Sequence, residues 1–326
     1  MGNTAKIQHY VPQFLLRNFG AGKKDRLHVF DKQTGDVFVT KARNVAAESR
    51  FYDFQFNGQT LTVEPELAAL ESKVQPLVQR VLDSDTLGVL TTDDRLTLST
   101  FFAIQHTRTR SFREQWRSLP TLLGEHLRKF VTSEDQLSKV ADYIRVPDEN
   151  EATVETVRFM LHEAPKYVPL FAEKTWILLR TDRNRAFLIG DNPIALQNMN
   201  DYGPYGNLGL GVRGIEIYFP LSSTRALALW CPSIEAALRE ASAKVGLLRA
   251  MPNVADPRVQ SLRDMMAAIE TGCPVTFSQE HVVNFNSLQI RYAERYVFSP
   301  NDDFGLARQM IAAHPELRTG PRPTTS

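Results

Sequence analysis

The chain has 326 residues, of which 43% are hydrophobic and 23% charged, a composition typical of a folded globular protein rather than a disordered one. Its 38 Lys and Arg residues nearly match its 37 Asp and Glu residues, so the formal net charge of +1 argues against a histone-like or polybasic membrane-binding protein. Cys231 and Cys273 are too few for a disulfide framework, and the longest strictly apolar run, Ala226–Cys231, is too short to span a membrane. We therefore expect a cytoplasmic protein that does not enter a membrane.

The first part of the chain predicts one short helix and two β-hairpins. Pro12 suits the first turn of a helix over residues 11–19, and Gly20 follows as a stop signal. Each hairpin consists of two strand-forming runs around a polar turn, which is Asn57 and Gly58 in the second hairpin. The four strands are predicted over residues 27–30, 37–39, 51–56 and 60–63.

The middle of the chain has the three- and four-residue hydrophobic spacing of amphipathic helices. One helix begins at Glu64 and contains Pro76, which we expect to kink it. Thr92, followed by two aspartates, is a good N-terminus for a single long helix that runs to about Trp116. Three more helices are predicted over residues 122–131, 134–144 and 152–163.

Near residue 175 the pattern changes to strands and then returns to helices. Short apolar runs between turn-rich segments predict strands over residues 176–179, 186–189, 215–219 and 226–230. Three further helices are predicted over residues 233–241, 257–269 and 281–296. The segment 313–326 has several prolines and few bulky side chains, so we expect it to be a disordered tail.

The order of these elements indicates an α+β fold rather than a doubly wound sheet. N-terminal hairpins are followed by a central helical block, by antiparallel strands near residues 175–230 and by C-terminal helices. We expect one composite domain over residues 1–312. Its three lobes are predicted to be the hairpins at 1–63, the helices at 64–172 and a mixed region at 173–312.

The first candidate functional residue is His9, which lies just before the proline-initiated helix. Proline restricts the backbone of the residue that precedes it, so the entrance to this helix has limited freedom. An imidazole at such a place can act as a general base or as a metal ligand. Arg17 follows one to two turns later and can point towards the same cleft. The alternative is that His9 only packs at the helix entrance.

The second candidate group lies on the predicted long helix, where polar side chains interrupt an apolar stripe. Gln105 and Thr109 occupy positions in the stripe, and Arg108 lies at its edge. An unpartnered buried polar group costs roughly 1–3 kcal/mol, so such interruptions are expected at functional or network positions. Arg108 and Arg113 suit a carboxylate or phosphate group. The alternative is a structural ion pair with an acid of the preceding helix, for which the candidates are Glu64, Glu66 and Glu71.

Further candidates lie in the last third of the chain. Asp191 and Asn192, followed by Pro193, come directly after a predicted strand, where a carboxylate can face a cleft. The same residues also favour a turn in which the side chains bond their own backbone. Asn286 falls on the apolar stripe of a predicted helix. It must be hydrogen-bonded there, either to buttress a loop or to contact a ligand.

Taken together, these segments resemble a bacterial family catalogued as domain of unknown function 4238. The resemblance spans roughly residues 8–300 and begins with the motif His-Tyr-Val-Pro at residues 9–12. The other similar segments are residues 16–19, 44–52, 105–113, 191–193, 219–222 and 286–299. One departure is Gly190, where we expect a serine. The family has no assigned activity, but the resemblance implies that five polar residues converge on one cleft, namely His9, Gln105, Arg108, Asp191 and Asn286.

The first hypothesis for function is a hydrolase that acts on a phosphate-bearing substrate, either a nucleotide or a nucleic acid. The expected catalytic residues are His9, Asp191 and Arg108, of which the arginine neutralises phosphate charge. His9 and Asp191 are also candidate ligands for a divalent metal ion, which would make the protein a metal-dependent phosphodiesterase or nuclease. The residues expected to bind or orient the substrate are Gln8, Arg17, Gln105, Arg113, Asn192 and Asn286.

The second hypothesis is a non-catalytic binding or sensor protein in which the same residues form a buried polar network. The near-zero net charge favours it over general nucleic-acid binding, which normally needs a basic face. The two hypotheses predict different structures. An open cleft lined by His9, Arg108 and Asp191 supports the enzyme, whereas a solvent-free cluster supports the network.

Overall fold

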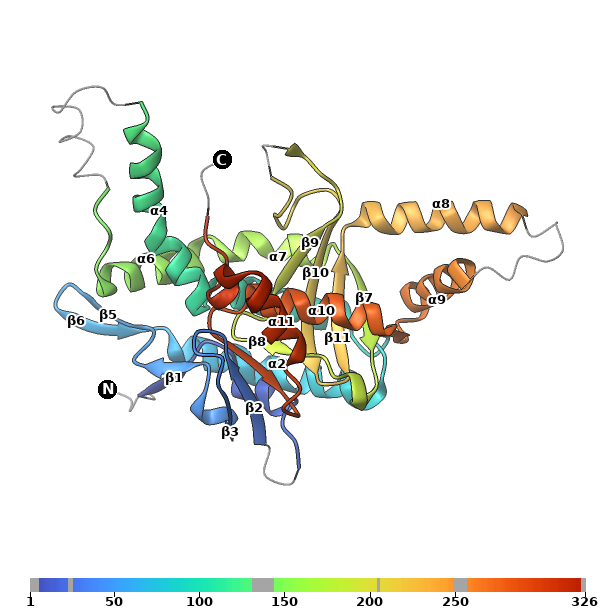
Figure 1. Ribbon diagram of the computed structural model, residues 1–326, viewed down its shortest axis with the longest axis horizontal. Helices are drawn as coiled ribbons and strands as arrows, with labels where there is room; N and C mark the ends of the chain where they lie inside the picture. The colour runs from blue at the N-terminus through green and yellow to red at the C-terminus, as the bar shows by residue number, and fades with distance from the viewer. Residues whose placement is uncertain (1–5, 23–25, 131–143, 204–205, 249–256, 324–326) are drawn as a thin grey trace.

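The computed structural model describes residues 6–22, 26–130, 144–203, 206–248 and 257–323 (Figure 1). The predicted α+β class is confirmed, because hairpins, a helical block, a largely antiparallel sheet and C-terminal helices follow one another along the chain. Within these residues no helix is long and apolar enough to cross a membrane.

Short strand pairs form much of the N-terminal part. β1 (Ile7–His9) pairs with β4 (Ala47–Ser49), and the predicted hairpin around Asn57 is formed by β5 (Asp53–Phe56) and β6 (Gln59–Thr62). The first predicted hairpin belongs to a four-stranded antiparallel sheet of order β3-β2-β13-β8. The strands of this sheet are β2 (Arg26–Asp31), β3 (Val37–Lys41), β8 (Ile189–Gly190) and β13 (Tyr296–Ser299). The N-terminal hairpin is thus completed by two strands from the last half of the chain.

A five-stranded sheet of order β12-β7-β11-β10-β9 forms the centre of the molecule. Its strands are antiparallel except for β12, which runs parallel to β7. The strands are β7 (Thr175–Arg180), β9 (Ala195–Asn198), β10 (Ile215–Ser222), β11 (Arg225–Trp230) and β12 (Val275–Thr276).

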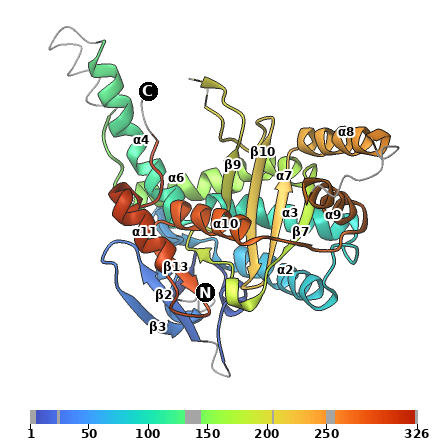
Figure 2. The ribbon, with the colours of Figure 1, turned by 45° about the vertical axis from the view of Figure 1, so that its right-hand side comes forward.

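Helices cover both faces of this sheet (Figures 1 and 2). Leu178 and Ile217 point to one face, where they join a large apolar cluster with α3 and α7. Ile177 and Tyr218 point to the other face and pack with residues of α9 and α10. This two-sided burial explains why the strands are apolar almost throughout. The helices are α1 (Gln13–Arg17), α2 (Glu64–Ser84), α3 (Thr92–Thr107), α4 (Arg110–Arg128), α6 (Glu149–His162), α7 (Ala164–Ala172), α8 (Pro232–Leu248), α9 (Pro257–Thr271), α10 (Gln279–Tyr292) and α11 (Gly305–Ala313).

The prediction of one long helix from Thr92 to Trp116 is wrong, because the chain breaks between α3 and α4. Thr109 has an extended backbone and caps α4, its side chain accepting a hydrogen bond from the backbone N–H of Phe112 at 3.3 Å. Its hydroxyl also donates to Asn192 Oδ1 at 3.3 Å. Threonine is a favoured N-cap. The residue that interrupts the apolar stripe therefore ends one helix and starts another.

Two expectations for the C-terminal part also need correction. The predicted helix over 281–296 ends at Tyr292, and β13 follows it. The segment 313–326 was expected to be disordered, but its described residues, to 323, include a 3-10 turn at Pro315–Arg318. This tail packs on the body because Arg322 forms an ion pair with the buried Glu294. The predicted helix over 134–144 falls almost wholly outside the described residues.

Candidate functional site

A buried polar cluster surrounds Arg108 at the end of α3. The Arg108 side chain is 1% exposed; its Nε donates to Gln105 Oε1 at 2.8 Å and its Nη1 to Glu71 Oε1 on α2 at 2.8 Å. Gln105, also fully buried, donates from Nε2 to the Tyr10 carbonyl at 2.9 Å. Arg108 and Gln105 therefore join α3 to α2 and to the N-terminal segment. The ion pair with Glu71 is the structural alternative that the sequence left open.

His9 lies at the edge of this cluster and is half-buried. Burial lowers the pKa of His9, an effect that the charge of Glu71 opposes and that of Arg108 reinforces. Its Nδ1 lies 3.5 Å from Gln13 Nε2, whereas its Nε2 is buried without a hydrogen bond of good geometry among the described residues, although the backbone of Ala42 and Arg43 lies close to the ring. A lowered pKa favours the neutral imidazole, which keeps one nitrogen free to accept a hydrogen bond.

Three of the predicted substrate-binding residues contact the protein itself. Gln8 is fully buried, donates to Asp53 Oδ1 at 2.7 Å and accepts from the Tyr52 backbone N–H at 2.6 Å. The Arg113 guanidinium lies over the Phe51 ring, 3.6 Å from its centroid, and donates to the Phe51 carbonyl at 2.7 Å. Arg17 is exposed and bonds Gln13 on its own helix. Gln8 and Arg113 thus hold the segment that leads into β5.

The open space beside the two buried arginines is too small for a substrate. Arg108 Nη2 and Arg113 Nε are buried without partners among the described residues. Both arginines line a hollow of about 10 Å³ together with Tyr52, Thr107 and Thr109. That volume has room for roughly one water molecule, which is a common partner of otherwise unpaired buried groups. No nucleotide fits there.

Asp191 is fully buried and its carboxylate is occupied by the protein backbone. Its Oδ1 accepts the N–H of Glu294 at 2.6 Å, and its Oδ2 accepts the N–H groups of Arg295 and Tyr296 at 3.0 Å each. Burial raises the pKa of Asp191 to about 6, although these N–H groups and the charge of Lys32 act in the opposite direction. The carboxylate fixes the turn between α10 and β13 through these three hydrogen bonds.

Asn192 and Asn286 buttress the backbone in the same way. Asn192 accepts from Thr109 and donates from Nδ2 to the Tyr292 carbonyl at 3.2 Å. Asn286 accepts from the Leu188 N–H at 2.8 Å and donates to the Ala186 carbonyl at 3.0 Å. Both amides therefore tie the chain around β8 to its neighbours.

The residue before Asp191 shows how tightly α10 packs here. A Cβ atom at Gly190 would lie 2.8 Å from the carbonyl oxygen of Gln289. The Gly190 N–H donates to Gln289 Oε1 at 3.0 Å. The close approach of α10 explains why glycine, and not the expected serine, is found at this position of the chain.

The predicted residues therefore separate into two connected clusters and do not line one open cleft. His9, Gln105 and Arg108 lie together, and Asp191 lies by the α10–β13 turn, with Thr109 and Asn192 linking the two regions. His9 and Asp191 do not come together with a third His, Cys, Asp or Glu, since the described residues contain no group of three or more that could hold a metal ion.

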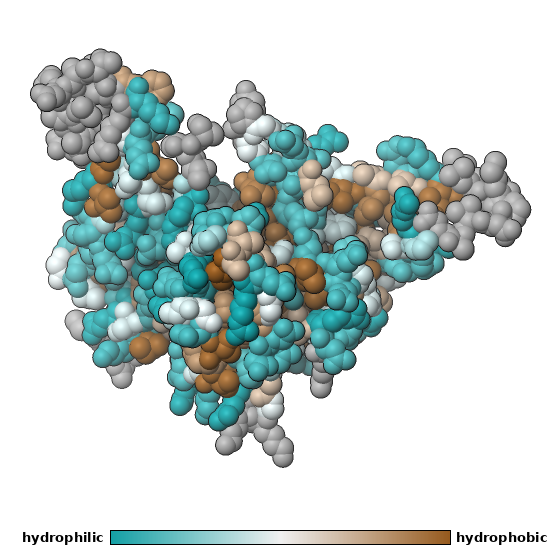
Figure 3. All heavy atoms as spheres, viewed as in Figure 1, coloured by the Kyte–Doolittle hydropathy of each residue, from teal (hydrophilic) through white to brown (hydrophobic). Residues whose placement is uncertain are grey.

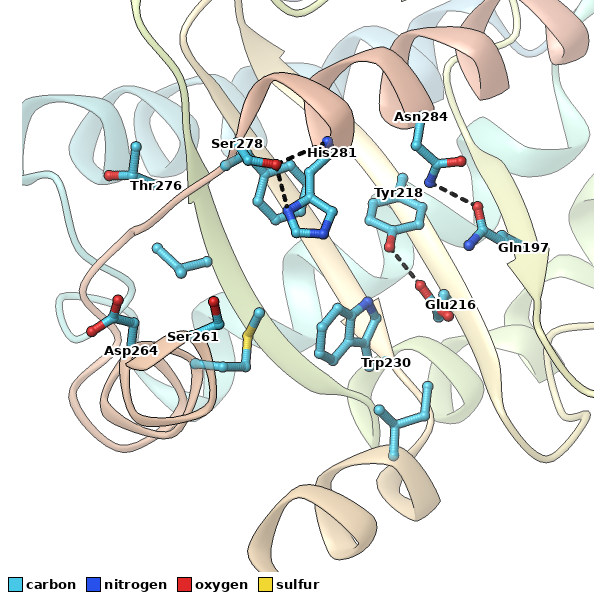
Figure 4. A pocket seen from close by; sticks show the side chains of 14 residues that line it. Gln197, Glu216, Tyr218, Trp230, Ser261, Asp264, Thr276, Ser278, His281 and Asn284 are labelled. Carbon is cyan, nitrogen blue, oxygen red and sulfur yellow. Dashed lines mark hydrogen bonds between the residues drawn. The ribbon is translucent and has the colours of Figure 1, made fainter. Parts of the chain in front are cut away.

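A separate hollow of about 360 Å³ opens on the face of the five-stranded sheet that α9 and α10 cover (Figure 4). The pairing of β10 with β9 and β11 determines which side chains form the floor of this hollow. Tyr218 lies opposite Ala228 in an apolar row, and two residues earlier on β10 Glu216 lies between Gln197 on β9 and Trp230 on β11. Side chains two residues apart share a face. The row formed by Gln197, Glu216 and Trp230 therefore continues the floor of the hollow beyond the apolar cluster that contains Tyr218.

Glu216 is the central polar group of this hollow. The Tyr218 hydroxyl donates to Glu216 Oε2 at 2.5 Å, and the two side chains point towards each other in Figure 4. Burial raises the pKa of Glu216, and the hydrogen bond from Tyr218 opposes that rise. Burial raises the pKa of Tyr218, an effect that the nearby Trp230 Nε1 opposes, although this nitrogen forms no hydrogen bond of good geometry among the described residues. The buried indole nitrogen thus lies against the Glu216–Tyr218 pair, whereas the Trp230 ring lines the hollow.

The walls of the hollow come from elements distant in sequence. His281, near the start of α10, lies across from Trp230, and its Nδ1 is 3.2 Å from the Ser278 hydroxyl (Figure 4). Asn284 donates to Gln197 Oε1 at 3.0 Å. The remaining lining residues are Ile234, Ser261, Asp264, Met265, Val275, Thr276 and Phe277.

The charge of the hollow favours some ligands over others. Its lining residues in the described chain include two acids, Glu216 and Asp264, and neither lysine nor arginine. Carboxylates repel a phosphate, whereas they attract a protonated amine or accept a hydrogen bond from a hydroxyl. The floor adds the Trp230 ring, the aromatic side chain best suited to contact a cation. The site therefore suits an apolar molecule with a hydrogen-bond-donating head group.

The sequence contains a local signal for this site. The strand predicted over 215–219 contains Glu216 and Tyr218 two residues apart within an otherwise apolar run, and a polar residue in such a run is typical of functional or network positions. The partners of these residues could not be identified, because Trp230, His281 and Asn284 reach the site only through sheet register and helix packing.

Comparison with known proteins identifies the family. A family model described as "Protein of unknown function (DUF4238)" matches residues 7–303. No curated protein and no solved structure matches the chain. The match confirms the family that the sequence motifs indicated and covers most of the chain. The chain therefore belongs to DUF4238, a family of proteins of unknown function.

Proposed function

We propose that this chain is a binding protein for a small, partly apolar molecule with a hydrogen-bond-donating head group, preferably an amine. The observation that carries this proposal is the half-buried Glu216 carboxylate on the floor of a hollow with neither lysine nor arginine in its described lining. Largely apolar pockets with a few convergent polar groups are the usual form of a small-molecule site. Glu216 binds the head group, and Trp230 packs against the apolar part.

We favour the non-catalytic hypothesis over the phosphate hydrolase. The reason is that the protein itself binds two of the three side chains expected to be catalytic. Both oxygens of Asp191 accept backbone hydrogen bonds, and Arg108 is paired with Glu71. These side chains then act as a structural network. If the wild type cleaved a nucleotide or nucleic acid in a metal-dependent reaction and His9→Ala did not, the hydrolase hypothesis would be favoured instead.

A cytoplasmic location is part of the same proposal. Cys231 and Cys273 are free, as a reducing compartment requires.

A matched series of ligands tests the proposed site. Benzylamine, benzyl alcohol and benzoate share one ring and differ in their head group, so their affinities, measured by ligand-observed NMR, report the preference of the site. We expect the amine to bind most tightly, the alcohol less tightly and benzoate least. Glu216→Gln should weaken amine binding about tenfold, because a charge-assisted hydrogen bond contributes roughly 1.5–3 kcal/mol, and should change alcohol binding little.

The control is Glu163→Gln, which removes an exposed glutamate paired with Lys166 on the surface. It should leave all three affinities unchanged. Lower pH offers a second readout: protonation of Glu216 should weaken amine binding more than alcohol binding. Tighter binding of benzoate than of benzylamine, or equal amine affinities in the wild type and Glu216→Gln, would contradict the proposal.

A further inference from the structure

A second hollow, of about 470 Å³, lies beside the start of β7. It is bounded by the start of α3, the start of α8 and the C-terminal end of α9. Figure 1 shows α8 extending from the body beside α9, and Figure 3 shows hydrophobic side chains along α8. In contrast to the hollow around Glu216, this second hollow has basic side chains in its lining, namely Arg95, Lys174 and Arg239.

Arg95 lines this hollow and forms no ion pair with a carboxylate of the described residues. It lies near the start of α3, is half-buried, and its guanidinium carbon is 5.4 Å from the centroid of the Trp176 ring. In the described part of the chain this ring is the side chain's only partner. The neighbouring acid, Asp94, is already bound by Arg80 at 2.6 Å and by the Thr91 N–H. Burial lowers the pKa of Arg95, and no nearby acid opposes that effect.

Lys174 supplies a second cation with spare donors. Its Nζ donates to the Leu210 carbonyl at 2.7 Å, which uses one of the three N–H bonds of an ammonium group. Burial lowers the pKa of Lys174, although Cys231 and Glu173 oppose the effect. A half-desolvated cation is stabilised by an anion that approaches it directly.

Two of the three acids that line this hollow interact with other lining residues. Glu235 accepts from the Thr175 hydroxyl at 2.6 Å and pairs with Arg239 at 2.7 Å. Glu270 lies 3.6 Å from the same Arg239 side chain. Glu173 also lines the hollow, but it acts on Lys174 and has no effect on the pKa of Arg95. Glu235, Glu270 and Arg239 therefore interact with one another along the hollow. Arg95 also lines the hollow but takes no part in these ion pairs.

We propose that this second hollow binds the oxyanion group of a small molecule, a carboxylate or a phosphate, with Arg95 as the primary contact and Lys174 as the second. A planar guanidinium can donate two parallel hydrogen bonds to such a group, and the ring of Trp176 holds it in position. The hollow is large enough for a molecule that extends beyond its anionic group. The inference is independent of the amine site, since the two hollows share no lining residue.

Titration with inorganic phosphate and with acetate at low ionic strength tests the site, with binding followed by NMR of the labelled full chain. We expect saturable binding of at least one anion by the wild type. Arg95→Gln should weaken it at least tenfold and Lys174→Gln several-fold. Binding of phosphate alone would identify a phosphate-bearing ligand, and comparable binding of acetate would identify a carboxylate ligand.

Two controls separate this site from general surface charge and from the hollow around Glu216. Arg117→Gln removes a partly exposed arginine paired with Glu114 on α4 and should change anion affinity less than twofold. Glu216→Gln should have no effect on it. Circular dichroism checks that each variant is folded. The proposal is overturned if neither anion binds saturably to the wild type, or if Arg95→Gln binds as tightly as Arg117→Gln.

Discussion

The two connected clusters around Arg108 and Asp191 contain a fully buried acid, Asp191, whereas the hollow around Glu216 contains a half-buried one, and the two regions use these acids differently. Asp191 uses both oxygens to accept three backbone hydrogen bonds. Glu216 accepts one hydrogen bond from Tyr218 and lines a hollow of about 360 Å³. A carboxylate that the backbone binds at both oxygens holds the fold, whereas one that accepts a single hydrogen bond beside open space can bind a ligand.

This difference explains why the most visible polar motif of the sequence is the less promising site. Gln105 interrupts an apolar stripe and Asp191 directly follows a predicted strand, and such polar residues need partners when they are buried. The sequence shows that need but does not show whether the partner is a ligand or the protein's own backbone. The structure supplies backbone partners for both residues.

Replacing Asp191 by alanine should have the largest effect on stability. Three buried backbone N–H groups lose their acceptor, and the buried Lys32 loses the charge of this carboxylate. We expect the free energy of unfolding to fall by about 3 kcal/mol or more, since each unsatisfied buried group costs roughly 1–3 kcal/mol. Urea unfolding followed by circular dichroism measures the change.

The matched control is Asp264→Ala, which removes an exposed carboxylate that lines the hollow. Exposed substitutions usually change stability by less than about 0.5 kcal/mol. If Asp191→Ala proves no more destabilising than Asp264→Ala, the carboxylate is not part of a structural network, and the distinction between the two regions fails.

Glu64, at the start of α2, should produce a smaller effect that depends on pH. Burial and the charges of Glu71 and Asp53 raise its pKa to about 7 in the folded protein, against the opposing charge of Arg108. The folded state therefore holds this proton more tightly than the unfolded state. Its contribution to stability is complete below the unfolded pKa of about 4.5 and is lost as the pH rises through about 7.

The Glu64→Gln variant should remove part of the loss of stability between pH 5 and pH 8. Because the side chain is only half-buried, water screens its charge, and we expect a difference of about 1 kcal/mol. Denaturant unfolding at several pH values measures it. Glu66→Gln, an exposed neighbour on the same helix, is the control and should follow the wild type. Identical pH profiles for Glu64→Gln and the wild type would exclude this role for Glu64.

Much of the fold could be predicted because its signals are local. The turn at Asn57 and Gly58 has positive φ at both residues, as the hairpin prediction requires. The break between α3 and α4 was missed because Thr109 reads as part of an apolar stripe until Asn192, from a distant segment, is known to bind it. Local spacing cannot show such a contact.

The candidate site could be predicted only in part, because its residues come together through contacts between distant segments. The pairing of Arg108 with an acid of the preceding helix was among the predicted alternatives, and Glu71 fills that role. The hollow around Glu216 depends on how β9 and β11 align with β10 and on the approach of α9 and α10. Both the strand register and the packing of the helices depend on several segments that are distant in the sequence, so no single segment predicts them.

The central claim is that Glu216, and not His9, belongs to the ligand site. The most direct test is the affinity of benzylamine for the wild type, Glu216→Gln and His9→Ala, after circular dichroism shows that all three are folded. The account predicts that affinity falls about tenfold in Glu216→Gln, the loss of one charge-assisted contact, and stays within twofold in His9→Ala. Loss of binding in His9→Ala together with normal binding in Glu216→Gln would contradict the account and return the site to the Arg108 cluster.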